Sequence, residues 1–339
     1  EQDTAVRRLN FAQMFNPLGS MVGIVLAQQL ILSHLNPATA EERALMDAAT
    51  RQGIIHNELF WVCAPYVGLC AIAALIWAFF LLKRDGEKGV TRSALARVLA
   101  ALGFSVVPMT VLYFLFPDMD KISWVLCGVA GPVVYVLILK DYREMLVTLL
   151  RIPRYWMGVI AQFFYVGVQI MCWTFIIQYG TRIFVEQGMG EKEAEILSQK
   201  YNIFAMVFFC ASRFICTFLM RYFKAGLLLK YLAVGGAIFT LGVICSQSVL
   251  GLYCLIGVSA CMSLMFPTIY GIALDGLNDD DAKFGAAGLI MAILGGSVLP
   301  PLQAMIIDQQ MLFGYPAVNL SFVLPLICFL VVMWYGNNK

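Results

Sequence analysis

The sequence predicts an all-α membrane protein that crosses the bilayer about ten times. Hydrophobic residues make up 61% of the 339 residues, charged residues make up 13%, and the mean hydropathy is +0.80. A soluble core cannot bury so much apolar surface. A helix needs about 20 apolar residues to cross a bilayer, and segments of this kind recur along the chain. They lie at 11–32, 58–82, 98–116, 122–139, 156–179, 202–220, 227–247, 249–274, 284–307 and 317–335.

The charges of the connecting loops support this set of spans, because cytoplasmic loops are enriched in Lys and Arg. Of the 23 basic residues, one side collects 16, the other side holds six, and Arg213 lies within a span. Both ends of the chain are therefore predicted to face the cytoplasm. The sixteen are Arg7, Arg8, Lys83, Arg84, Lys88, Arg92, Arg97, Lys140, Arg143, Arg151, Arg154, Arg221, Lys224, Lys230, Lys283 and Lys339.

Several classes of function are excluded by what the sequence contains. A net charge of +2, with basic residues spread between apolar segments, argues against binding of nucleic acid. All ten cysteines lie in apolar runs without a CxxC spacing, and both histidines, His34 and His56, fall in the outer segment 33–57, so no metal site is expected. No phosphate-binding GxxxxGK[ST] motif occurs, which argues against an ATP-driven pump, and no span carries a carboxylate beyond its ends. Because no histidine lies within a span, a membrane-embedded hydrolase or acyltransferase is not expected either, and we expect neither an enzyme nor a cofactor.

Segments outside the membrane are few. The outer segments 33–57 and 180–201 mix acidic and basic residues at helical spacing and are expected to form solvated caps. The inner stretch 83–97 combines glycine with five basic residues, which is typical of a flexible linker on an anionic leaflet and marks a boundary between two halves. The chain begins at Glu1 without an initiator Met or a signal peptide, so we expect a fragment or a processed form.

Polar side chains within the spans are the first candidates for function, because hydrocarbon offers them no hydrogen bonds. Gln13 and Asn16 are three residues apart on one helix face, and their amides both donate and accept, as sugar hydroxyls do. Hydrogen bonding between helices is the alternative for this pair. Arg213 is either a donor that faces a cavity or a side chain that extends to the interface beside Arg221.

A second polar face lies on the span 156–179. Two amides and two aromatic side chains follow one another at offsets of 0, 3, 7 and 11, which is one continuous face of a helix. An aromatic ring can lie against the C–H face of a pyranose, and amides can hydrogen-bond its hydroxyls. Packing in the protein core is the alternative interpretation of this face. The four are Gln162, Tyr165, Gln169 and Trp173.

Two further spans contain residues that bend helices or allow close packing. Met291 precedes the pair Gly295 and Gly296, and two prolines follow at 300 and 301. Pro267 has the same effect on the span 249–274.

Five stretches of this chain resemble, in order, the fucose–proton symporter family of the major facilitator superfamily. The first is similar to the family's fifth helix and the others to its seventh, eighth, tenth and eleventh helices. They are RLNFAQMFNPLG at 8–19, IAQFFYVGVQIMCW at 160–173, SRFICTFLMRYF at 212–223, MSLMFPTIYGIAL at 262–274 and KFGAAGLIMAILGGSVLPP at 283–301.

The resemblance implies two bundles of the major-facilitator type in the cytoplasmic (inner) membrane. Residues 1–83 would be the remnant of an N-terminal six-helix bundle, 84–155 a cytoplasmic linker with two additional transmembrane helices, and 156–339 a C-terminal six-helix bundle. The family's first four helices, with the carboxylates that handle its proton, have no counterpart in the chain. Phe266 stands where the family's fucose transporter has a pocket tyrosine.

The function expected from the resemblance is secondary active transport of a hexose or deoxyhexose with protons by alternating access. The expected partners are the sugar, the proton and the lipid bilayer. A transporter of another small solute, or a sugar sensor or assembly subunit that does not transport, are the alternatives. The residues expected to bind the substrate are Gln13, Asn16, Gln162, Tyr165, Gln169, Trp173, Arg213, Phe266 and Met291.

Overall fold

The computed structural model describes residues 46–83 and 140–337 except Phe313, together with nine isolated positions between 19 and 43. Gln13, Asn16, the linker 84–97 and the expected spans 98–116 and 122–139 lie outside the described residues, as does most of the span 11–32. Within the described part, seven helical segments are long and apolar enough to cross a membrane, and they correspond to the other seven expected spans. The predicted all-α, polytopic fold class is confirmed.

The chain divides into two compact units, one of residues 1–22 and 147–339 and the other of residues 23–146. In the second unit, helix α4 (Ala48–Lys83) begins ten residues before the expected span. Arg43 clamps the carboxylate of Glu58 with both terminal nitrogens, at 2.8 and 2.6 Å, and also donates to the carbonyl of Asn36. A two-pronged contact of this kind fixes both position and direction. It ties the segment before α4 to the helix.

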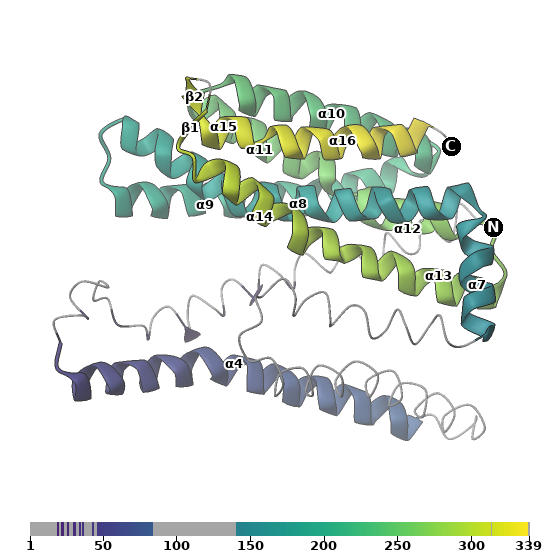
Figure 1. Cartoon of the computed structure of the whole chain (residues 1–339), viewed down its shortest axis with the longest axis horizontal. Helices are drawn as coiled ribbons and strands as arrows, with labels where there is room; N and C mark the ends of the chain where they lie inside the picture. Colours follow the sequence, from purple (N-terminus) through teal and green to yellow (C-terminus); the bar gives the residue numbers. More distant parts are fainter. Residues whose placement is uncertain are drawn as a thin grey trace. The chain divides into compact units, whose positions relative to one another are not determined.

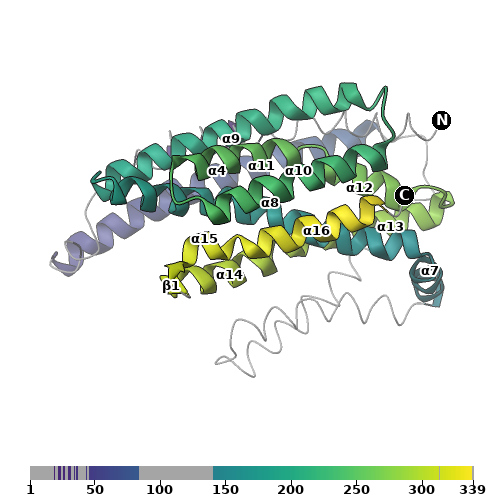
Figure 2. The same ribbon diagram turned by 90° about the horizontal axis from the view of Figure 1, so that it is seen from above.

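The first unit is a bundle of long helices that run side by side in both views (Figures 1 and 2). Helix α7 (Lys140–Leu150) crosses the boundary between the two units, and six spans follow it. Three of these spans are single helices, and each of the other three is interrupted. In chain order the elements are α8 (Pro153–Glu186), α9 (Glu191–Leu219), α10 (Ala225–Cys245), α11 (Val249–Met262), α12 (Met265–Leu274), α13 (Asp279–Met291), the 3-10 turn η2 (Ala292–Leu294), α14 (Gly295–Ile307), the strands β1 (Met311–Leu312) and β2 (Tyr315–Pro316), α15 (Ala317–Ser321) and α16 (Val323–Asn337).

Helices α8 and α9 extend through most of the segment 180–201, which was expected to form a cap. This segment contains no proline before or after its tight turn, and Glu191 and Glu193 favour the first turn of α9 through the helix dipole. The turn itself depends on Gly188, whose φ of +91° is strained for any other common residue. Hydropathy locates the part of a helix that hydrocarbon covers, and the helix itself continues beyond it.

The span of α11 and α12 breaks at Ser263 and Leu264 because of Pro267. A proline has no N–H, so the carbonyl four residues earlier, that of Ser263, loses its helical partner. Pro300 and Pro301 lie within α14. The bend at Pro267 is therefore present as an interruption, whereas α14 continues through Pro300 and Pro301 and the interruption of that span, η2, lies before Gly295.

Close approach between helices relies on glycine. The backbone carbonyl of Phe163 on α8 lies against Gly295 at the start of α14, where a Cβ would clash with it. Gly158 and Gly167 similarly admit Tyr335 and Leu299. Small residues let helix backbones meet at close range, and dispersion contacts are the main attraction between helices in lipid. This contact fixes α14 against the middle of α8.

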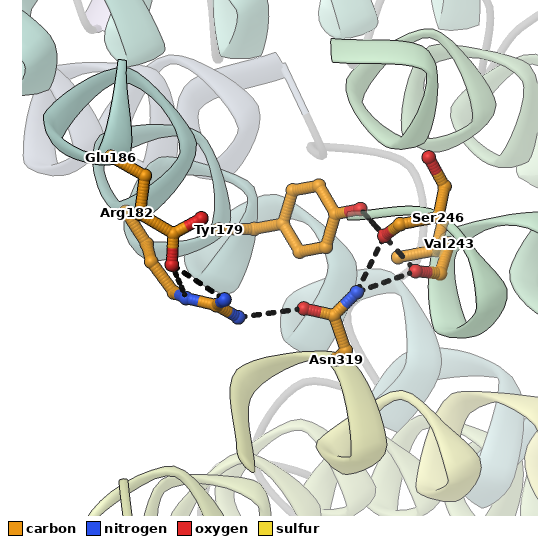
Figure 3. A network of polar contacts seen from close by, with 6 residues as sticks. All are labelled: Tyr179, Arg182, Glu186, Val243, Ser246 and Asn319. Atoms are coloured by element: carbon orange, nitrogen blue, oxygen red, sulfur yellow. Dashed lines mark hydrogen bonds and ion pairs between the residues drawn. The ribbon is translucent and has the colours of Figure 1, made fainter. Parts of the chain in front are cut away.

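The bundle is tied at the end where α8 gives way to α9 (Figure 3). Asn319 donates to the carbonyls of Val243 and Ser246 at 3.1 and 2.6 Å, and Tyr179 donates to Ser246 at 2.6 Å, so the last carbonyls of α10 have partners. The Asn319 side-chain oxygen in turn accepts from Arg182, at 3.0 Å. At the opposite end Arg154 bonds the carboxylate of Asp275, at 2.9 Å.

We predict that Gly295→Ala destabilises the protein by about 1–3 kcal/mol, because the new methyl group meets the rigid carbonyl of Phe163. Thermal unfolding in detergent measures the change. The control is Gly53→Ala in α4, where a Cβ meets nothing within 4 Å and alanine favours the helix. Equal melting temperatures for the Gly295→Ala protein and the unmodified protein would contradict the close packing.

We predict that Asn319→Ala also destabilises the protein, by about 1–3 kcal/mol, since the carbonyls of Val243 and Ser246 each lose one of their two donors and keep only Tyr179. Asn337→Ala is the matched control, because this amide bonds Lys230 at an exposed position. If both variants melt alike, the network of Figure 3 does not hold the bundle together.

Candidate functional site

The expected site residues that the structure describes fall into three groups. Tyr165, Arg213 and Phe266 gather around the break between α11 and α12. Gln162, Gln169 and Trp173 lie on the same face of α8 as Tyr165. Met291 is exposed at the end of α13.

Arg213 and Tyr165 satisfy the backbone at the break. The Arg213 Nε donates to the freed carbonyl of Ser263 at 2.6 Å, and the Tyr165 hydroxyl donates to the carbonyl of Met262 at 3.0 Å. Both side chains are buried, Arg213 with 3% of its surface exposed. An unpaired carbonyl in hydrocarbon costs several kcal/mol, so these donors allow the break to exist.

Two serines extend this arrangement. The Ser263 hydroxyl donates to that of Ser212 at 3.1 Å, and Ser212 donates to the carbonyl of Ala260 at 2.8 Å. Three consecutive polar groups thus connect α9 to the end of α11. Sequence reasoning did not identify the serines, although Pro267, four residues after Ser263, indicates which carbonyl becomes free.

Aromatic side chains surround the same break. The Phe266 ring lies 6.3 Å from that of Tyr165, edge to face, and 6.5 Å from that of Tyr270, stacked. The Arg213 guanidinium lies 4.8 Å from the centre of the Phe209 ring, which suits a cation–π contact. Phe209 in turn meets the Trp173 ring at 5.0 Å, edge to face. Trp173 is therefore linked to Arg213 through a residue that was not predicted.

Gln162 differs from its neighbours because its amide has no partner. The side chain is fully buried, and neither its oxygen nor its nitrogen makes a hydrogen bond. The Trp173 ring nitrogen is also buried and unpaired. Buried polar groups are rarely left in this state, and those that are need an explanation. On α8, these are the buried side-chain atoms that are left available to a ligand.

Among the described residues, no group of three or more His, Cys, Asp or Glu side chains is placed to hold a metal ion.

Taken together, the long apolar helices of the described residues, three of them interrupted, define a multi-pass membrane protein with polar groups in its interior. No protein-family model matches the chain. It is 42% identical to the L-fucose-proton symporter of Haemophilus influenzae, over 99% of this chain and 67% of that protein. It is 26% identical to the L-fucose-proton symporter of Escherichia coli and 25% identical to a glucose/galactose transporter of Brucella abortus, over 98% of this chain and 64% and 63% of those proteins.

Solved structures agree on the fold. The chain superposes on a crystal structure of the E. coli fucose:proton symporter, FucP, with a TM-score of 0.70 at 23% identity, covering 100% of this chain and 70% of that one. A structure of the major facilitator superfamily transporter FucP in the outward conformation gives 0.66 at 23% identity, with 69% of that chain covered. The chain spans about two thirds of the length of its curated relatives.

This chain belongs to the L-fucose-proton symporter family, and its fold is that of the major facilitator superfamily transporter FucP. Its relatives are transporters, which confirms that the family is not one of enzymes.

We predict that Arg213→Met destabilises the protein by about 1–3 kcal/mol, because the Ser263 carbonyl is left buried without a donor. Thermal unfolding in detergent measures this loss. Pro267→Ala restores the N–H that reaches the same carbonyl, so the double variant should recover much of the stability that Arg213→Met loses. If the change in unfolding free energy of the double variant equals the sum of the changes in the two single variants, Arg213 and Pro267 act on different groups.

Proposed function

We propose that this chain forms part of a carrier that moves a hexose or deoxyhexose across the cytoplasmic membrane, together with protons, by alternating access. The observation that carries the proposal is the buried, unpaired amide of Gln162 within a bundle of this family. The relatives named above support the sugar and the proton, and the unpaired groups of α8 support the place where the sugar binds.

The Gln162 amide fits a sugar hydroxyl chemically. Its oxygen accepts and its nitrogen donates, and a hydroxyl does both. Leaving such groups buried and unpaired costs about 1–3 kcal/mol each. A ligand that pairs with both atoms recovers this free energy on binding. Tyr165, one turn further along α8, is committed to the Met262 carbonyl, so we assign it to holding the pocket wall.

The aromatic groups at the break would form the apolar side of this site. Phe266 stacks on Tyr270 and meets Tyr165, which holds its ring in place. A ring without a hydroxyl can lie against the C–H face of a pyranose but cannot bond its oxygens. Gln13, Asn16 and Gln169 complete the proposed lining, and Trp173, further along the same face of α8, is proposed to contact the substrate as well. Met291, exposed on α13, and Arg213, bonded to Ser263, are proposed as peripheral members.

The charges at the two ends of the bundle indicate its orientation in the membrane. The turn between α9 and α10 carries Arg221 and Lys224, and Arg151 and Arg154 lie at the start of α8. The turn between α8 and α9 is flanked by Glu186, Glu191 and Glu193. We therefore propose that the basic end faces the cytoplasm, with both ends of this chain on that side.

The proposed organisation keeps the boundaries drawn from the sequence. The six spans between Pro153 and Asn337 in one compact unit support a C-terminal six-helix bundle at 156–339. The segments 1–83 and 84–155 are proposed as the remnant of the N-terminal bundle and as a linker with two additional helices.

A hexose other than fucose is the second candidate substrate. A relative named glucose/galactose transporter covers 98% of this chain, and Phe266 provides no hydroxyl to the site. Competition by L-fucose, D-galactose and D-glucose for uptake of a labelled sugar into proteoliposomes separates the two candidates.

We predict that Gln162→Leu in the full-length protein weakens sugar binding by about 1–2 kcal/mol, or roughly five- to thirtyfold. The melting temperature of the unliganded protein should stay equal or rise, because an unpaired amide is replaced by an apolar group. Titration calorimetry and thermal unfolding measure the two quantities. Gln178→Leu, at an exposed position of the same helix, is the control. Unchanged affinity, or a clear loss of stability, would remove Gln162 from the site.

A further inference from the structure

The unpaired groups of α8 extend further than one sugar can reach. Gln162 and Trp173 are eleven residues apart on one face, which corresponds to about 16 Å along the helix axis. A single pyranose ring is much shorter than this. The Trp173 ring nitrogen and the Gln162 amide, all buried and without partners, therefore cannot be satisfied by the same sugar molecule at the same time.

A matching line of residues follows α9. Asn202, Phe209 and Arg213 are spaced at offsets of 0, 7 and 11, so they share one face of that helix. Phe209 contacts Trp173, and Ser198, one turn before Asn202, accepts a hydrogen bond from Thr181 at 3.4 Å.

These two contacts set the level of Asn202 along the pair of helices. Asn202 lies between Ser198 and Phe209 on α9, so its level falls between those of their partners on α8, Thr181 and Trp173. These two partners are about 12 Å apart along α8. Asn202 is thus on the side of Trp173 away from Gln162, toward the turn between α8 and α9.

Of the two polar residues on this face of α9, only Asn202 has a side-chain atom without a partner. Arg213 is bonded to the Ser263 carbonyl and lies on the Phe209 ring. At the other end the side-chain oxygen of Asn202 is buried and has no donor, while the Trp173 ring nitrogen is a donor with no acceptor. An acceptor and a donor that lack partners are complementary to a sugar, whose hydroxyl groups both donate and accept.

We propose that Trp173 and Asn202 form a second sugar subsite, between the Gln162 site and the end of the bundle where α8 turns into α9. One hydroxyl of the sugar accepts from Trp173 and a different hydroxyl donates to Asn202, because Asn202 lies seven residues, or about 10 Å along the helix axis, from Phe209, which Trp173 contacts. The half-buried Trp173 ring provides the apolar surface. The subsite rests on the proposed function, because it takes the same substrate. It binds more weakly than the Gln162 site, since it offers fewer polar groups, and a sugar occupies it on the way to that site.

The test is the number of sugar molecules that bind to the full-length protein at equilibrium. Equilibrium dialysis with labelled L-fucose, D-galactose and D-glucose should show two per protein chain for one of these sugars, one tight and one weak. Asn202→Ala and Trp173→Phe should each weaken the second event at least fivefold. Gln162→Leu should instead weaken the first.

Gln199→Ala is the matched control, because this amide lies one turn from Asn202 on α9 and bonds Glu195 at 3.5 Å. It should bind two sugars as the unmodified protein does. Asn202→Ala should also melt at an unchanged temperature, since its side-chain oxygen has no partner to lose.

The outcomes separate the subsite from the proposed function. If the unmodified protein binds none of the three sugars, the proposed function fails. If it binds one sugar at saturation, the second subsite is wrong, whether or not Asn202→Ala weakens that single event. The subsite is also wrong if two sugars bind and neither Asn202→Ala nor Trp173→Phe affects the weaker one.

Discussion

The hydrogen bond from Arg213 to the carbonyl of Ser263 is the contact on which the unit of residues 147–337 depends. Pro267 leaves this carbonyl without a helical donor, and hydrocarbon offers no substitute. The guanidinium replaces the missing N–H, and the Tyr165 hydroxyl does the same for Met262. The chain can therefore leave the helix at Ser263 and Leu264 in the middle of an apolar bundle. Phe266, immediately after the break, then packs between Tyr165 and Tyr270.

The polar groups at the two ends of this unit are hydrogen-bonded, whereas the Gln162 amide between them is not. At the end where α8 turns into α9, Asn319 and Tyr179 close the last carbonyls of α10, and at the other end Arg154 holds Asp275. These groups are saturated, as structural polar groups in a bundle should be. The unpaired amide of Gln162 lies between the two ends. A bundle fixed at both ends and left unsatisfied in its interior is suited to move as one body around a ligand.

The sequence predicted the described spans and the break before Pro267, because hydropathy and proline act locally, but α14 continues through Pro300 and Pro301. It missed the length of α8 and α9, since charged residues at 180–201 end the apolar run without ending the helix. For the site it identified Tyr165 and Arg213, but their partners are backbone carbonyls about 100 and 50 residues away, which only the tertiary fold brings near. Asn319 was missed for the same reason, because an amide at the end of a span does not reveal which carbonyls it will meet.

The most direct test of this account is a structure of the full-length protein with its sugar bound. The account predicts a sugar hydroxyl within hydrogen-bonding distance, about 3 Å, of the Gln162 amide, while the Arg213 Nε stays on the Ser263 carbonyl and the break in the span of α11 and α12 is unchanged. A structure in which Arg213 leaves Ser263 to bind the sugar, and Gln162 remains without a polar partner, would contradict it.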